Sequence, residues 1–207
     1  VCHGVPSPAV FRAYLDSLEA ARGSRAVSVR FKDKSHGWAH PWFTVQFADG
    51  SVYTEDFNRT GYGRGFGMQL FLRPACARCR YTSTSRPADF TLADYWGLDE
   101  KLALPVERDK GVSMVLVNSA RGQAVFDALS PRFGQVERPL AEAVAGNPRL
   151  ASPLKANPRR AAFFAAFAAL PFAEVEKRFL ALPSLPYRAA AKVLTPAMKE
   201  KIRKLLK

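Results

Sequence analysis

The sequence predicts an α+β fold, in which a small mixed or antiparallel β-sheet is flanked by helices and followed by a helical, basic C-terminal region. Two patterns predict it. Apolar residues recur at helical spacing near the start and after residue 139, whereas they alternate with a period of two in 26–57. The 207 residues are 48% hydrophobic and 24% charged, as in ordinary globular proteins. We expect one domain over 1–150 and a helical basic extension over 151–207.

The first part of the chain predicts one helix and then three strands. Residues 6–22 place Pro8 at the first helical position, and Gly23 is a typical helix end. The alternation within 26–57 predicts three antiparallel strands. An Asp-Gly pair at 49–50 predicts the hairpin between the last two of them.

The middle of the chain predicts a less regular arrangement. The four glycines within 58–75 would weaken a helix by roughly 1 kcal/mol each, so we expect an irregular helix whose backbone approaches another group closely. Residues 90–96 and 113–118 predict two strands, and a helix follows from Ser119. A short strand is expected near 135–137.

The net charge of +13 is unevenly distributed along the chain. Residues 151–207 hold 12 Lys and Arg against 3 Asp and Glu. Such a basic half indicates an anionic partner, or simply a solvated helical surface. Residues 187–207 predict an amphipathic basic helix, which could bind a membrane surface weakly, dock an acidic ferredoxin or pack on the domain. We favour packing.

The sequence has no membrane-spanning or export signal. No apolar run reaches the ~20 residues that a transmembrane helix needs. Residues 1–4 lack the charged start and apolar core of a signal peptide. We therefore expect a cytoplasmic protein, and, because there is no initiator Met, a chain that begins within a longer polypeptide.

The cysteines carry the clearest chemical signal. Cys2 stands alone, and a CxxC motif lies at 76–79. Two thiolates at this spacing can bind a soft metal ion or an iron–sulfur cluster, or can form a redox disulfide. Nearby positive charge would lower thiol pKa values and offset the charge of a thiolate-bound group. The flanking cations are Arg73, Arg78 and Arg80.

Spacing alone leaves other interpretations of the cysteines open. A Cys3His zinc site could complete the set, giving a zinc-stapled basic module for nucleic acid. Alternatively, Cys2 is a small buried hydrophobe and the chain is a cluster-free structural fragment. No recognised nucleic-acid motif is present, so we expect no nucleic-acid partner. The candidate histidine ligands are His3, His36 and His40.

Six segments carry a resemblance to a known family. They are VCHGVPSP at 1–8, RFKDK at 30–34 with GW at 37–38, GF at 65–66, LRPACARC at 72–79, ADFTLADYWG at 88–97 and KGVS at 110–113. In this order they resemble the C-terminal half of the coenzyme F-420 hydrogenase/dehydrogenase beta subunits. The family usually has Gly at the position of Ala93.

The resemblance implies an iron–sulfur flavoprotein that contains FAD and a [4Fe–4S] cluster. It implies that Cys2, Cys76 and Cys79 are three ligands of one cluster, with the fourth cysteine upstream of Val1. Electrons would pass between a ferredoxin, or an N-terminal ferredoxin-like module, and FAD or a deazaflavin-type acceptor. The sequence does not name the physiological acceptor.

The flavin site is predicted from the needs of its two parts. An isoalloxazine ring needs a flat apolar wall, and a pyrophosphate needs cations or free backbone N–H groups. The glycine series is not the GxGxxG dinucleotide fingerprint, because no βαβ unit surrounds it. No catalytic residue is predicted, because the chemistry would belong to the cofactors. The candidate flavin-binding residues are Lys34, Arg64, Gly65, Arg73, Asp94 and Trp96.

Overall fold

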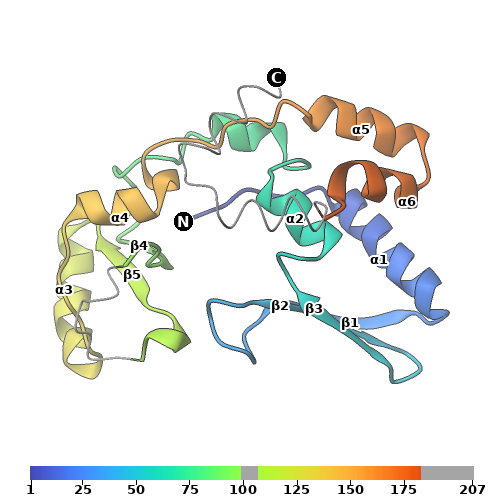
Figure 1. Ribbon diagram of the computed structural model, residues 1–207. Helices are drawn as coiled ribbons and strands as arrows, with labels where there is room; N and C mark the ends of the chain where they lie inside the picture. Colours follow the sequence, from blue (N-terminus) through green and yellow to red (C-terminus); the bar gives the residue numbers. More distant parts are fainter. Residues whose placement is uncertain (99–106, 183–207) are drawn as a thin grey trace, which may run out of the picture.

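The fold is α+β, as the sequence predicted, with two small antiparallel sheets and helices packed around them. The computed structural model describes residues 1–98 and 107–182, so the predicted helix at 187–207 lies outside the described residues. Figure 1 shows two lobes joined in an arch: the first contains β1, β2 and β3, and the second contains β4 and β5.

Helix α1 (Pro8–Arg22) has the ends that the sequence predicted. Pro8 occupies its first turn, and Gly23 ends it in the left-handed conformation (φ 66°). Ser7 stands at the N-cap but makes no side-chain capping bond. Its backbone N–H instead donates to the carbonyl oxygen of Phe71 at 3.0 Å. The start of α1 is therefore tied to a distant part of the chain.

The first sheet confirms the three predicted antiparallel strands. It consists of β1 (Ala26–Asp33), β2 (Trp42–Phe47) and β3 (Val52–Asp56), with β2 in the centre. The β1–β2 register shifts between Arg30 and Asp33, and Lys32 lies in this bulge with a positive φ of 49°. A bulge of this kind redirects side chains at a sheet end.

Helix α2 (Gly61–Gly67) confirms the prediction of a helix with a closely approached backbone. Thr60 caps it by accepting a hydrogen bond from the N–H of Gly63 at 2.9 Å. A Cβ on Gly63 would lie 1.8 Å from the carbonyl oxygen of Phe57. The glycines of this helix therefore allow α2 to pack against the chain itself.

The core of the first lobe is completed by residues late in the sequence. Helices α5 (Arg160–Ala169) and α6 (Phe172–Val175) and the π-helix η5 (Glu176–Leu180) cover it. Phe163 is fully buried and its ring lies 5.7 Å from that of Phe71. The domain boundary at residue 150 stays a prediction.

The second lobe is built on β4 (Phe90–Asp94) and β5 (Ser113–Val117), which pair antiparallel. Helices α3 (Ala120–Leu129) and α4 (Leu140–Gly146) accompany them. Among the described residues, the 3-10 helices are η1 (Pro74–Arg78), η2 (Arg108–Lys110), η3 (Ser130–Arg132) and η4 (Pro148–Leu150). No helix in the described ranges is long and apolar enough to cross a membrane.

The strand predicted near 135–137 is wrong. These residues form no strand and are exposed. A cavity of about 960 Å³, lined by β5 on one side and by 133–138 on the other, separates this segment from the nearest strand. Without a neighbouring backbone, local alternation cannot produce a sheet ladder.

Candidate functional site

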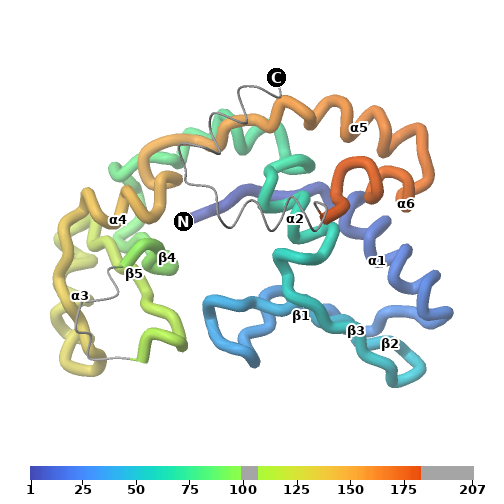
Figure 2. Tube along the Cα trace, in the orientation of Figure 1, coloured from blue at the N-terminus to red at the C-terminus, as the bar shows by residue number. Residues whose placement is uncertain are grey.

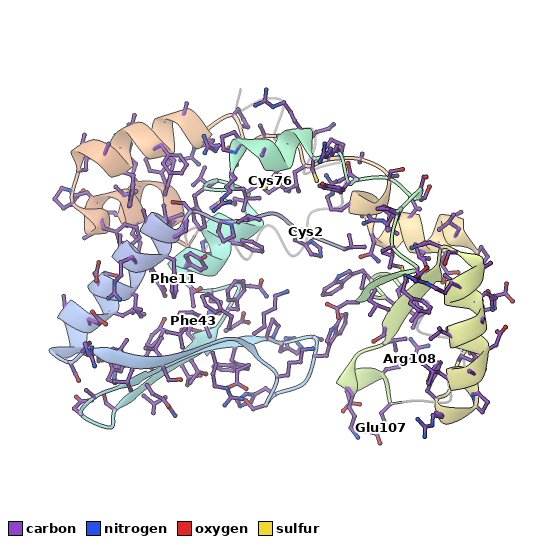
Figure 3. The ribbon with its side chains drawn as sticks, turned by 180° about the vertical axis from the view of Figure 1, so that it is seen from behind. Cys2, Phe11, Phe43, Cys76, Glu107 and Arg108 are labelled. Atoms are coloured by element: carbon purple, nitrogen blue, oxygen red, sulfur yellow. The ribbon has the colours of Figure 1, made fainter. Side chains whose placement is uncertain are left out.

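The N-terminal segment is paired with the segment that leads into the CxxC loop. Pro6 and Leu72 form an antiparallel bridge, flanked by backbone hydrogen bonds of 3.0 and 2.9 Å. In an antiparallel pair the two chains run in opposite directions, so positions before Pro6 face positions after Leu72. This register directs Cys2 toward Cys76. Figure 3 shows both residues in the middle of the arch.

Backbone N–H groups of this segment donate to two of the sulfur atoms. The N–H of Gly4 donates to the Sγ of Cys2, and the N–H of Val5 donates to the Sγ of Cys76, both at 3.3 Å. Consecutive backbone nitrogens are at most about 3.7 Å apart, so these two sulfurs lie within about 10 Å of each other. Two cysteines that are 74 positions apart in sequence are thus neighbours in space.

All three thiols are free and accessible enough to bind a ligand. Cys2 is exposed, and Cys76 and Cys79 are half-buried. Pro74 begins the short helix η1, which contains Cys76 and ends at Arg78, just before Cys79. The thiols are therefore not small hydrophobes hidden in the core.

The described side chains form no site for a single metal ion. Among the residues that the structure describes, no three His, Cys, Asp or Glu side chains are placed to share one metal ion. A zinc ion needs its ligands at about 2.0–2.3 Å from one centre. In a [4Fe–4S] cluster each cysteine binds a different iron, so the sulfurs stand further apart. The geometry gives no support to the Cys3His alternative, and the cluster ligands stay a prediction.

A basic cavity lies beside Cys76. It has a volume of about 300 Å³. Arg73, predicted from sequence, lies on its wall with Arg78. Lys155, in the connection between α4 and α5, and Arg160, the first residue of α5, also line it, and sequence reasoning missed both. Their position could have been suspected only from the absence of acidic residues around them.

A second cluster of predicted residues lies where the lobes meet. The rings of Trp38 and Trp96 are 4.4 Å apart at 34°. Lys34 accepts a backbone hydrogen bond from Gly37 in the turn just before Trp38. Asp94 ends β4, two residues before Trp96. Lys34 and Asp94 therefore lie close in sequence to this aromatic pair, which includes a third predicted flavin-binding residue, Trp96.

Burial and several charged groups around His3 shift its pKa. Burial is the first cause that lowers its pKa, followed by the positive charge of Lys32. Asp94 acts in the opposite direction, and Arg149 adds to the lowering. Lys32 and Arg149 were not predicted as site residues. The bulge that orients Lys32 has no sequence signal, and Arg149 lies far along the chain.

Arg64 and Gly65 lie apart from both clusters, in α2. The Nε of Arg64 donates to the carbonyl oxygen of Leu180 at 3.0 Å, which ties α2 to the end of η5. A Cβ on Gly65 would lie 2.2 Å from the ring of Phe71. Packing within the first lobe therefore accounts for both residues.

Comparison with known proteins agrees with the resemblance seen in the sequence. The family model that describes the C terminus of the coenzyme F420 hydrogenase/dehydrogenase beta subunit matches residues 1–137. The match includes the three cysteines and every predicted flavin-binding residue. Searches of curated proteins and of solved structures returned no match.

Proposed function

This chain belongs to the coenzyme F420 hydrogenase/dehydrogenase beta-subunit family, a family of oxidoreductase subunits, and from that premise we propose that it carries the cluster of an iron–sulfur flavoprotein. In this proposal, electrons pass between a ferredoxin-like donor and FAD or a deazaflavin-type acceptor. When bound, the cluster supplies single-electron transfer and the flavin supplies hydride or electron-pair chemistry. The chain itself binds and tunes these groups.

The observation that carries the proposal is the antiparallel pairing that brings Cys2 to the CxxC loop. We propose Cys2, Cys76 and Cys79 as three ligands of one [4Fe–4S] cluster. The fourth cysteine would come from polypeptide outside this sequence. The three free thiols supply the ligand type that such clusters use.

Groups around the sulfurs would tune the cluster. Hydrogen bonds from the N–H groups of Gly4 and Val5 withdraw negative charge from the sulfur atoms. Arg73 and Arg78 add positive charge beside Cys76. Both effects stabilise the more negative, reduced state and so raise the reduction potential.

For the flavin, we propose the region where the lobes meet. Trp96 and Trp38 offer aromatic surface, and Lys34 offers a cation for an anionic group. We propose Asp94, the last residue of β4, as a hydrogen-bond acceptor at the rim of this site. Arg73 would extend the positive surface toward the cysteines. Arg64 and Gly65 are not needed, because packing already explains them.

Metal and sulfide analysis tests the cluster. The chain would be produced anaerobically within its complete polypeptide, and iron, sulfide, zinc and flavin would be measured. We expect about four iron and four sulfide for this site, lost in Cys76→Ser and retained in His36→Ala as the control. Zinc without sulfide, or iron and sulfide contents that are unchanged in Cys76→Ser, would contradict the proposal.

The chain of 207 residues alone tests the origin of the fourth ligand. We expect weak or no cluster assembly from it, because only three thiols are present. A stoichiometric [4Fe–4S] cluster in the isolated chain would show that a local residue supplies the fourth ligand. That result would overturn the external ligand while leaving the three cysteines in place.

A further inference from the structure

A cationic surface lies beside Cys76, where Arg73, Arg78, Lys155 and Arg160 line one cavity. The two stretches that contribute these residues, 73–86 and 149–160, are hereafter the cationic face. Neither stretch contains Asp or Glu. The eight cations of the cationic face are Arg73, Arg78, Arg80, Arg86, Arg149, Lys155, Arg159 and Arg160.

Specific contacts hold the second stretch of the cationic face against the chain segment that precedes the first. The Nδ2 of Asn157 donates to the carbonyl oxygen of Met68 at 2.7 Å. The Nε of Arg160 donates to the carbonyl oxygen of Leu72 at 2.8 Å. Figures 1 and 2 show the connection between α4 and α5 running beside the segment that follows α2. Four of these cations, Arg73, Arg78, Lys155 and Arg160, therefore gather around one cavity.

The positive charge of the cationic face is not neutralised within the described chain. The ion pairs found among the described residues all join side chains outside the cationic face. Arg159 and Arg160 instead lie over aromatic rings, at 5.1 Å from Phe179 and 4.5 Å from Phe164. Arg73, Arg78 and Lys155 are exposed. An anionic partner would meet these charges without competing carboxylates.

We propose that the cationic face docks an acidic electron-carrier protein, an inference that rests on the proposed function of the cysteines. Four cations of the cationic face line the same cavity as the half-buried Cys76, a proposed cluster ligand, which is where a carrier must approach. Complementary charge steers such encounters and sets their orientation. Electron-transfer contacts are small and transient, so charge rather than apolar area would define this one.

The composition of the cationic face favours a protein over a membrane or a nucleic acid. Within these two stretches, Tyr81 is the one large apolar side chain that is strongly exposed, at 60%. A surface that inserts into lipid needs an apolar stripe beside its cations. Single-stranded nucleic acid needs several aromatic platforms for its bases. A folded acidic surface needs neither.

Charge-reversal variants test the docking. The probe is a small, acidic [2Fe–2S] ferredoxin, with its binding to the chain measured by surface plasmon resonance at several salt concentrations. We expect Arg78→Glu and Lys155→Glu each to weaken binding about tenfold at low salt. The matched control is Arg25→Glu, which makes the same charge change at an exposed position away from the cationic face. It should change binding by less than about twofold.

Further arms distinguish this proposal from its alternatives. Lys155 is exposed, so Lys155→Glu should leave folding, checked by circular dichroism, unchanged. Equal loss in all three variants, or binding only to phosphatidylserine–phosphatidylcholine vesicles or duplex DNA, would overturn the docking. Iron and sulfide are measured separately in the complete polypeptide. Ferredoxin binding that depends on Lys155 supports the docking even where no cluster is found.

Discussion

A single methyl group added at Gly63 should destabilise the protein strongly, although alanine is the better helix former. A Cβ there would lie 1.8 Å from the carbonyl oxygen of Phe57 and 2.9 Å from the Oγ1 of Thr60. The obstructing atom belongs to the backbone, so it cannot rotate away. The hydroxyl of Thr60 also caps α2 through the N–H of Gly63, and that bond would be disturbed.

The magnitude follows from two opposing effects of Gly63→Ala. Helix propensity favours alanine by about 1 kcal/mol. Overpacking typically costs 1–3 kcal/mol and more when the neighbour cannot move. We expect the free energy of unfolding to fall by about 2–4 kcal/mol, which lowers Tm by roughly 5–15 °C for a chain of this size. Urea and thermal unfolding followed by circular dichroism would measure it.

Gly67→Ala is the matched control in the same helix. Nothing lies within 4 Å of a Cβ at Gly67, so the variant should gain stability by up to about 1 kcal/mol. If Gly63→Ala proved as stable as Gly67→Ala, the close packing of α2 against Phe57 would be refuted.

Four further variants, one of them a control, test the core and two carboxylates. Phe163→Ala should reduce the free energy of unfolding by about 3–5 kcal/mol, because the Phe163 side chain is fully buried. The control is Phe133→Ala, which should cost less than about 1 kcal/mol because Phe133 is 46% exposed. Similar losses in the two variants would argue against this core. Burial raises the pKa of Glu176 above its ordinary 4.5. The folded state therefore keeps this carboxyl protonated to a higher pH than the unfolded chain does. Stability is lost as the pH rises from 4.5 through the raised pKa. Urea titrations at several pH values should therefore show that the free energy of unfolding of Glu176→Gln rises relative to that of the native chain above pH 4.5. Parallel pH profiles of the two proteins would contradict this. Hydrogen bonds from Arg121 lower the pKa of Asp89 below 3.8. The ionised carboxylate therefore stabilises the folded state above pH 3.8, and this stabilisation is lost as the pH falls below it. Asp89→Asn should reduce the loss of stability at acid pH, and an unchanged loss would exclude the pairing.

The elements that the sequence predicted well are those with local signals. Pro8 and Gly23 bound α1 because they act on the backbone conformation of their own turn. The Asp-Gly pair at 49–50 likewise places the hairpin between β2 and β3. The segment at 135–137 has the alternation but no neighbouring strand, and alternation alone cannot supply one.

The site was predictable only in part because it depends on long-range contacts. The three cysteines could be chosen by chemistry and by resemblance, but the bridge between Pro6 and Leu72 could not be read from either segment alone. Arg160 reaches a carbonyl 88 positions earlier. No local pattern predicts such a contact, so the charges that the second stretch of the cationic face brings to Cys76 were missed.

The most direct test of the account is whether Cys2 reaches the CxxC loop in solution. In Cys79→Ser, the remaining thiols would be treated at low protein concentration with a thiol-specific cross-linker that spans about 10 Å, and the products would be mapped by mass spectrometry. The account predicts an intramolecular Cys2–Cys76 link, because the backbone pairing holds the two sulfurs within about 10 Å. Reagent attached to each thiol without a link between them, or links only between molecules, would contradict it.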